Sequence, residues 1–502
     1  MRDRDLISKD SEDGGPLLHP DHARPVTRRQ FLGQGFLTGA AWVTLPSLAQ
    51  LLDPRVAEAQ LSCGLGGGGK IPYIGIDLAG GASIAGSNVL VGLQGGQLDV
   101  LSDDAYVKFG LPTDQFPQLP NMVNTELGIA FHADSALLRG IIDKTSLAAR
   151  ALVNGTVFCA RSDNDTGNNP HNPIYGINKA GADGNLVTLI GTRSSDSGGK
   201  SAVPMSMFDA SVRPTKVDRP SDVTGLVDAG RLSQMLGQGG TASVMAASEQ
   251  ISNLKIDALG ANTDTPTRTQ LRCGYLESTN LISTFGDPNA LDPEQDPEIT
   301  GLVTSIFDAN EIGESEFRKI ASAMKLVVNG NAGGATCEFG GYDYHNSTRS
   351  TGENKDFRAG QAIGAAIEYA HRLGRPLMLY IFSDGSVSSN GQLDNSTDGR
   401  GKGIWRSDNS GTASTLILVY NPVVRPVMRT AASHQIGYFR DSGSVETSAT
   451  VVADEPALLA EAIVLNYMAL HNEEANFGSV LPGHSLGSGA ALDSLIAFAP
   501  IL

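Results

Sequence analysis

The stretch Gly340-Gly341-Tyr342-Asp343-Tyr344-His345 opens the part of the chain that decides the fold. A segment with apolar residues at helical spacing follows over Asp356–Leu373, and then comes the apolar run Leu377-Met378-Leu379-Tyr380-Ile381-Phe382. This run ends in Ser383-Asp384-Gly385-Ser386, the start of a second polar loop. The order of loop, helix, buried strand and loop is typical of an open α/β sheet. Ligands of such sheets bind at the carboxyl edge of the strands, and we expect a site there.

The segments around this stretch extend the α/β pattern. Short apolar runs predict further strands, and longer runs with helical periodicity predict helices. Because the two kinds alternate, the sequence favours a mainly parallel sheet. Strands are expected over Ile71–Leu78, Val153–Ala160 and Thr415–Tyr420, and helices over Leu127–Leu147, Glu314–Leu326 and Pro456–Leu470. Residues from about 185 to 312 combine polar loops with helical pieces, and we interpret them as an insertion or cap.

Composition and charge exclude some classes of partner. The chain has 502 residues, of which 40% are hydrophobic and 18% charged, so it is long enough for a large globular core. Its formal net charge is −17 at pH 7. Nucleic acids and anionic membranes bind basic surfaces, so neither is expected as a partner.

The N-terminal region predicts export. Thr27-Arg28-Arg29-Gln30-Phe31-Leu32 precedes a moderately apolar segment that runs to Leu52, and Ala57-Glu58-Ala59 supplies a small-x-small cleavage site. Paired arginines ahead of Phe-Leu resemble a twin-arginine signal, which is read by the twin-arginine export machinery. The alternative, a retained membrane anchor, suits the segment less well because glycines and a proline interrupt it. We therefore expect a signal peptide over residues 1–59 and a periplasmic or secreted mature chain, residues 60–502, without a permanent membrane span.

The four cysteines lie beyond the expected cleavage site, at Cys63, Cys159, Cys273 and Cys337. In an oxidising compartment two disulfides are possible, and three pairings fit the sequence. None of the cysteines are spaced as Cys-x-x-Cys, which argues against a zinc–thiolate site.

Two candidate site residues follow from local patterns. The first predicted strand ends in Gly80-Gly81-Ala82-Ser83, and glycines after a strand let the backbone approach a ligand closely, so Ser83 stands where a nucleophile or an anion-binding group is useful. His171 lies between Pro170 and Pro173, which predicts a rigidly presented side chain near the surface that contacts an anion or a leaving group.

Two further polar residues have a structural and a functional interpretation. Asp77 is the one charge in an apolar strand, and buried carboxylates are rare unless they are paired or bind a metal. A satisfied structural carboxylate and a functional one both fit it. His132 falls in the helix expected over Leu127–Leu147, and we interpret it as a helix-capping or core-edge residue rather than a ligand.

Together, the twin-arginine signal, the Gly-Gly-Ala-Ser turn, the segment Gly340–His345 and the turn Phe382–Asp384 resemble the exported bacterial family labelled domain of unknown function 1501. That family is similar to alkaline phosphatases and sulfatases. The resemblance spans roughly residues 71–502 and implies an α/β/α sandwich with a metal-assisted site for phosphate or sulfate esters at the carboxyl edge of the sheet.

Carried onto this chain, the resemblance implies that Asp343, His345 and Asp384 bind a divalent metal, which is zinc, manganese, calcium or magnesium, with Ser83 after the glycine turn. Two positions depart from the family pattern. Ser386 and Val387 stand where the family has a glycine and an arginine, and Asp398 is followed by Gly399 where the family has an Asp-His pair. Asp398 is therefore a fourth candidate ligand without the neighbouring imidazole.

The same loop has a second interpretation that needs no catalysis. Asp384-x-Ser386-x-Ser388 copies the Asp-x-Ser-x-Ser arrangement of von Willebrand A-type adhesion domains, where a carboxylate and two hydroxyls hold magnesium for a partner's acidic group. The sequence thus supports two functions. One is a metal-dependent hydrolase of a small phosphate or sulfate ester, and the other is a non-catalytic protein that keeps the fold to bind a cell-envelope partner.

Overall fold

The computed structural model describes residues 69–163, 168–227, 240, 243–244, 246–248, 250–256, 288–301 and 304–502. Most of them belong to one compact unit, formed by Ser62–Gln238 and Asn280–Leu502. The described residues between 240 and 256 belong to a second unit, Met1–Leu61 with Gly239–Thr279. The expected signal peptide, Cys63 and Cys273 lie outside the described residues.

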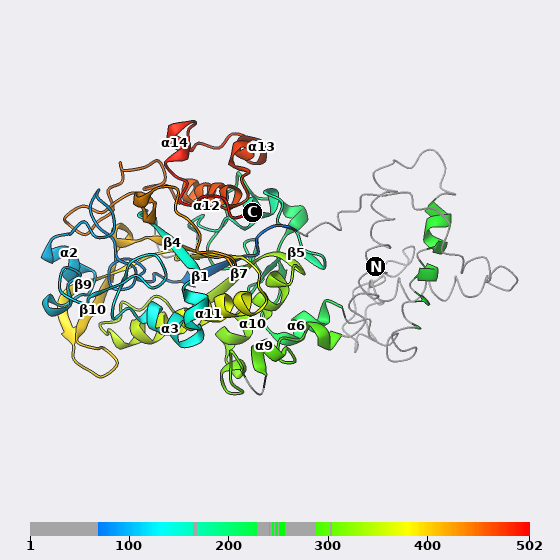
Figure 1. The fold of residues 1–502 in the computed structure, drawn as a ribbon, viewed down its shortest axis with the longest axis horizontal. Coiled ribbons are helices and arrows are strands. Elements are labelled where there is room, and N and C mark those ends of the chain that lie inside the picture. The colour runs from blue at the N-terminus through cyan, green and yellow to red at the C-terminus, as the bar shows by residue number, and fades with distance from the viewer. Residues whose placement is uncertain are drawn as a thin grey trace, which may run out of the picture. The chain divides into compact units, whose positions relative to one another are not determined.

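The larger unit alternates strands with helices (Figure 1). The strands are β1 (Tyr73–Ala79), β2 (Val123–Asn124), β3 (Phe131–His132), β4 (Val153–Phe158), β5 (Val187–Gly191), β6 (Thr215–Lys216), β7 (Ala332–Gly340), β8 (Leu377–Phe382), β9 (Val387–Asp394), β10 (Lys402–Asp408), β11 (Thr415–Tyr420) and β12 (Gln435–Ile436). The α-helices are α2 (Asp103–Lys108), α3 (Ala136–Lys144), α4 (Leu147–Arg150), α5 (Ile174–Lys179), α6 (Pro220–Gly225), α9 (Pro297–Thr300), α10 (Ser315–Val328), α11 (Ser350–Arg372), α12 (Pro456–Leu470), α13 (Phe477–Val480) and α14 (Ala490–Asp493).

The central sheet has eight strands in the order β12-β4-β11-β8-β1-β7-β5-β6. Neighbouring strands pair in parallel except on either side of β11, which is antiparallel to both β4 and β8. β1 occupies the middle, with Ile76 opposite Cys337 of β7 and Ile381 of β8. The carboxyl ends of β1, β7 and β8 therefore meet at one edge, as the expectation of a mainly parallel α/β sheet requires.

Helices cover both faces of the sheet. Helices α3, α10 and α11 lie on one side of it and α12 on the other (Figure 1). Along β1 the buried side chains alternate, because successive residues of a strand point to opposite faces. Ile74 and Ile76 belong to the core formed with α3, α10 and α11, whereas Tyr73 belongs to the core formed with α5 and α12. This arrangement is compatible with the expected α/β/α sandwich.

Several expected elements agree closely with the structure. The strands over Leu377–Phe382 and Thr415–Tyr420 and the helix over Pro456–Leu470 have the expected bounds. The helix expected over Asp356–Leu373 is α11, which begins six residues earlier, at Ser350. Long segments with a regular apolar pattern give the strongest secondary-structure signals in a sequence, because burial of their apolar side chains decides the local conformation.

The expected helix over Leu127–Leu147 is shorter, and His132 does not lie on it. Phe131 and His132 form the short strand β3, and the helix begins only at Ala136, where the Ser135 side chain accepts a hydrogen bond from the Leu138 amide and caps it. The Nε2 atom of His132 lies 2.8 Å from the carbonyl oxygen of Gln115, and burial lowers the pKa of the imidazole to about 4. His132 is therefore a structural, core-edge histidine.

Part of the expected insertion belongs to the sheet. Strands β5 and β6 fall within residues 185–312, and β5 pairs with β7 while β6 pairs with β5. Strand β7 itself has no counterpart among the expected strands, because Ala332, Gly333 and Gly334 give it little apolar signal. A Cβ atom on Gly333 would lie 2.5 Å from the carbonyl oxygen of Ala182, so close backbone packing selects the small residue.

Cys159 and Cys337 are free thiols buried in the core. Burial raises the pKa of both, for Cys337 to about 12, which makes them poor nucleophiles and poor metal ligands at neutral pH. The sequence allowed two disulfides in three pairings, and the structure shows neither Cys159 nor Cys337 in a disulfide. None of the described helices is long and apolar enough to cross a membrane.

Candidate metal centre at the carboxyl edge of the sheet

Three turns meet where β1, β7 and β8 end. Gly80, directly after β1, donates its amide hydrogen to Oδ1 of Asp384 at 2.6 Å. Gly80 has a φ of +135°, and a Cβ atom there would lie 2.4 Å from the amide nitrogen of Asp343. A Cβ atom on Gly81 would lie 3.3 Å from the amide nitrogen of Ser386. Glycine is therefore needed for the turn after β1 to pack between the other two turns.

The segment after β7 presents one carboxylate and one imidazole. The side chains of Tyr342 and Tyr344 are fully buried, whereas those of Asp343 and His345 are partly exposed, so burial alternates along these four residues. Nε2 of His345 lies 2.7 Å from Oδ1 of Asp343. The tyrosines thus place both polar side chains at the surface of the edge.

Asp408, the last residue of β10, lies beside His345 at the same edge. Its Oδ1 lies 3.3 Å from Nε2 of His345. Asp408 pairs with Val387 of the antiparallel strand β9, and the next residue, Asn409, donates its amide hydrogen to the carbonyl oxygen of Ser386 at 2.8 Å. The hairpin is therefore tied to the turn after β8, which brings Asp408 to the carboxyl edge of the main sheet.

Asp343, His345 and Asp408 form a group that can hold a metal ion. One ligand atom from each lies within 4.8 Å of the other two, and all three side chains keep contact with solvent. Two carboxylate oxygens and one imidazole nitrogen are ligands for zinc, manganese and related divalent ions. Three protein ligands also leave coordination positions for water or substrate, as in catalytic metal sites.

Asp384 is not part of this group and has other partners. Its side chain is fully buried, Oδ1 accepts the Gly80 amide hydrogen, and Oδ2 lies 3.1 Å from Nζ of Lys200. Burial raises the pKa of this carboxyl, although Gly80 and Lys200 oppose the rise. Asp384 therefore supports the turn after β1 and holds the Lys200 ammonium at the same edge of the sheet, which the sequence did not indicate.

Asp77 is a satisfied buried carboxylate rather than a ligand. Oδ2 accepts the amide hydrogens of Lys200 and Ser201, both at 2.8 Å, and Oδ1 accepts the Ser201 hydroxyl at 3.0 Å. Burial raises the pKa of Asp77 to about 7. The carboxylate holds the loop that carries Lys200, so the structural interpretation of this residue fits its contacts.

Ser83 does not present a nucleophile to solvent. Its side chain is almost fully buried, and Oγ lies 3.5 Å from the carbonyl oxygen of Ala85. Its amide donates to the hydroxyl of Tyr344 at 2.7 Å. These contacts fix the turn after β1, which agrees with a structural role.

His171 is buried, contrary to the expectation of a position near the surface. Its side chain is 1% exposed, and burial lowers the pKa of the imidazole to about 4. Among the described residues neither ring nitrogen has a hydrogen-bond partner. The segment is close to the candidate edge, because Asn169 donates from Nδ2 to the carbonyl oxygen of Asp384 at 2.7 Å.

Asp398 lies apart from the metal-ligand group. It is exposed, in the turn that joins β9 to β10, whereas Asp408 lies at the far end of β10. Of the four predicted ligands, the structure therefore brings together Asp343 and His345 and adds Asp408. Asp408 was missed because the segment after Ser386 was interpreted as a polar loop, whereas its place depends on the pairing of β9 with β10.

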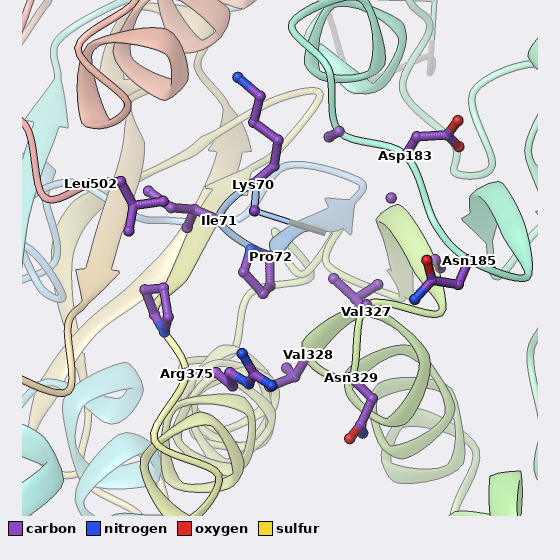
Figure 2. A pocket seen from close by; sticks show the side chains of 16 residues that line it. Lys70, Ile71, Pro72, Asp183, Asn185, Val327, Val328, Asn329, Arg375 and Leu502 are labelled. Carbon is purple, nitrogen blue, oxygen red and sulfur yellow. The ribbon is translucent and has the colours of Figure 1, made fainter. Parts of the chain in front are cut away.

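A hollow of about 330 Å³ lies at the opposite edge of the sheet, where β1 and β7 begin (Figure 2). Its polar side chains come from Lys70, Asp183, Asn185, Asn329 and Arg375, and Nζ of Lys70 pairs with Glu473. None of the predicted site residues lines it. The hollow is therefore separate from the candidate metal centre.

No protein-family model matches the chain, and a search of curated proteins finds no similar protein.

Proposed function

We propose that this protein binds a divalent metal ion through Asp343, His345 and Asp408 and hydrolyses a phosphate or sulfate ester at that ion. The observation that carries the proposal is the convergence of three ligand atoms within 4.8 Å at the carboxyl edge of a mainly parallel sheet. Ligands of open α/β sheets bind at this edge. The ligand set suits zinc or manganese, because it mixes one imidazole with two carboxylates.

A bound ion of this kind lowers the pKa of a coordinated water and neutralises the developing charge of an ester oxygen. The attacking group would then be water, since Ser83 is buried in the turn after β1. Lys200 supplies a second positive charge at the same edge of the sheet. Its Nζ lies 3.1 Å from Asp384, and Asp384 and Asp343 both pack against Gly80. A cation beside a metal favours anionic substrates such as phosphate and sulfate esters.

The helices on both faces of the sheet are compatible with the alkaline-phosphatase-like sandwich that the sequence suggests. The proposal includes export by the twin-arginine machinery to the periplasm or beyond, on the strength of Arg28-Arg29 and the cleavage site after Ala59. The resemblance to the family labelled domain of unknown function 1501 depends on short motifs in this chain, and no family model matches the chain. Its motif residues Asp343 and His345 are two of the three proposed ligands.

A second candidate function is metal-dependent binding of an acidic group on a cell-envelope partner, without catalysis. One observation favours it: the predicted nucleophile Ser83 and the predicted ligand Asp384 are both buried and engaged in the support of turns. A half-exposed metal with open positions can accept a carboxylate from another protein as readily as an ester. The two functions share the metal centre and differ in turnover.

The test compares the metal content of the purified chain with that of Asp343→Ala and Asp398→Ala. Asp398 is exposed but lies outside the ligand group, so its variant is a matched control for the loss of one surface carboxylate. We expect one equivalent of zinc or manganese in the parent chain and in Asp398→Ala, and less than a tenth of this in Asp343→Ala. Equal metal content in the two variants contradicts the site.

Ester hydrolysis is then measured with p-nitrophenyl phosphate and p-nitrophenyl sulfate in the presence of each metal. Turnover that disappears in Asp343→Ala and persists in Asp398→Ala supports the hydrolase. A metal-loaded chain without turnover on either class of ester favours the binding function instead.

A further inference from the structure

The phenol of Tyr344 connects the turn after β1 to helix α11. Its oxygen accepts the amide hydrogen of Ser83 at 2.7 Å and donates to Oδ1 of Asp356 at 2.9 Å. Asn88 links the same two residues, because its Nδ2 donates hydrogen bonds to Oδ2 of Asp356 and to the carbonyl oxygen of Ser83, both at 2.8 Å. All four residues are buried, so each bond is shielded from water and costly to lose.

The ring of Tyr344 also contacts the strand that carries Asp408. Its centroid lies 6.3 Å from that of Trp405, which is fully buried in β10 three residues before Asp408. The backbone reinforces this contact, because the Ser347 amide donates to the carbonyl oxygen of Trp405 at 3.0 Å and the Trp405 amide donates to that of Thr348 at 3.2 Å. Rotation or displacement of the Tyr344 ring would therefore shift β10 relative to the segment after β7.

Tyr344 thus stands between the two sources of metal ligands. Asp343 and His345 are its neighbours in the chain, and Asp408 follows Trp405. Tyr342 offers an internal comparison. It is equally buried and also donates to α11, at the carbonyl oxygen of Lys355 2.9 Å away, but no hydrogen bond of its hydroxyl reaches the turn after β1 in the described part of the chain.

We propose that Tyr344 is the positioning residue of the metal centre: its phenol, held by Asp356, fixes Asp343 and His345 relative to Asp408 without touching the ion. This inference rests on the metal centre proposed above. Groups behind the ligands orient them, and their loss typically lowers metal affinity by about 10- to 100-fold. Replacement of Tyr344 by phenylalanine keeps the ring but leaves the Ser83 amide and an oxygen of Asp356 without this partner.

The test is a Co²⁺ titration of the full chain, followed through the visible absorption of the bound ion, for the parent, Tyr344→Phe and Tyr342→Phe. Both variants lose one buried hydroxyl that donates to α11, and Tyr344→Phe also leaves the Ser83 amide without its acceptor, so urea unfolding should show a larger loss of stability in Tyr344→Phe than in Tyr342→Phe. We expect a dissociation constant raised about 10-fold and an altered absorption band in Tyr344→Phe, and a constant within about 2-fold of the parent in Tyr342→Phe.

Each outcome bears on the proposal. An unchanged Co²⁺ affinity in Tyr344→Phe, with the parent binding one ion, overturns the positioning role and leaves the metal centre intact. A parent chain that binds no Co²⁺, Zn²⁺ or Mn²⁺ overturns the centre and this inference with it. If Tyr344→Phe does not fold, Asp356→Leu carries the test, because it keeps the phenol and removes the acceptor of its hydrogen. The same 10-fold loss supports the role, and an unchanged affinity overturns it.

Discussion

Lys402 Nζ lies 2.9 Å from Oε1 of Glu353, and the two side chains are 0% and 3% exposed. This buried ion pair joins the first residue of β10 to helix α11. Arg349 donates to the same oxygen of Glu353 and stacks over the Trp405 ring, 4.3 Å from its centroid. The pair therefore belongs to a buried charged group that fastens the β9–β10 hairpin, and with it Asp408, to the main unit.

Replacement of Lys402 by methionine should lower the free energy of unfolding by about 3 kcal/mol. The substitution removes one partner and leaves the Glu353 carboxylate buried with less compensation, and the loss of one member of a buried pair usually costs this much. Urea denaturation followed by circular dichroism measures the change.

The matched control for Lys402→Met is Arg400→Met. Arg400 lies two residues before Lys402 and pairs with Asp134, but the Arg400 side chain is 41% exposed. Exposed ion pairs contribute at most about 1 kcal/mol, so this variant should unfold close to the parent. Equal destabilisation of the two variants would contradict the role of the buried pair.

Acid should weaken the fold in part through two buried histidines. Burial lowers the pKa of His132 and of His171 to about 4, below the 6.5 of an exposed imidazole. The unfolded chain therefore binds more protons than the folded chain between these values, and the stability that each neutral imidazole contributes is lost as the pH falls from about 6.5 towards 4.

A His171→Gln variant isolates this effect. The difference in unfolding free energy between parent and variant should shrink by up to about 3 kcal/mol from pH 7 to pH 4, because glutamine does not titrate. Comparison within this pair cancels the opposite contribution of Asp77, whose raised pKa favours the folded state at low pH and is shared by both chains. Urea titrations at pH 7, 5.5 and 4 measure the difference, and a constant difference across them rules out a neutral buried His171.

The turn after β1 should not tolerate a side chain at Gly80. In Gly80→Ala the new methyl group would lie 2.4 Å from the amide nitrogen of Asp343, and the φ of +135° is unfavourable for alanine. We expect a loss of more than about 2 kcal/mol of stability and weaker metal binding, since the segment that carries two ligands must move.

Gly340→Ala is the control for Gly80→Ala. A Cβ atom on Gly340 meets nothing within 4 Å, although this glycine is only three residues before Asp343. Thermal unfolding and metal titration should leave this variant near the parent. A stable Gly80→Ala chain with normal metal affinity would show that the three turns are less tightly packed than the structure indicates.

Local periodicity was sufficient to predict the main elements and the edge where the site lies. The apolar run Leu377–Phe382 and the helical repeat before it could adopt few other structures, and the polar turn after them had to fall at the carboxyl end of the strand. Strand β7 was missed because glycine and alanine give no apolar signal, although close packing against Ala182 requires small residues there.

The candidate site was only partly predictable because its members come from distant parts of the chain. Asp343 and His345 share one motif, so the sequence placed them together. Asp408 joins them only through the pairing of β9 with β10, and Lys200 only through a loop fastened to Asp77. No local pattern marks such contacts, since each depends on how separate segments pack.

Cys159 and Cys337 should behave as protected free thiols. Both are buried, and burial raises the pKa of each, so little thiolate is present and reagents have no access. Iodoacetamide should leave both residues unmodified in the native chain and alkylate both in guanidinium chloride without a reductant, as peptide mapping by mass spectrometry would show. If alkylation in denaturant required prior reduction, these residues would be disulfide-bonded. Labelling of Cys159 or Cys337 in the native chain would instead mean that the core around β4 and β7 opens readily. The full burial of both cysteines makes such opening unfavourable.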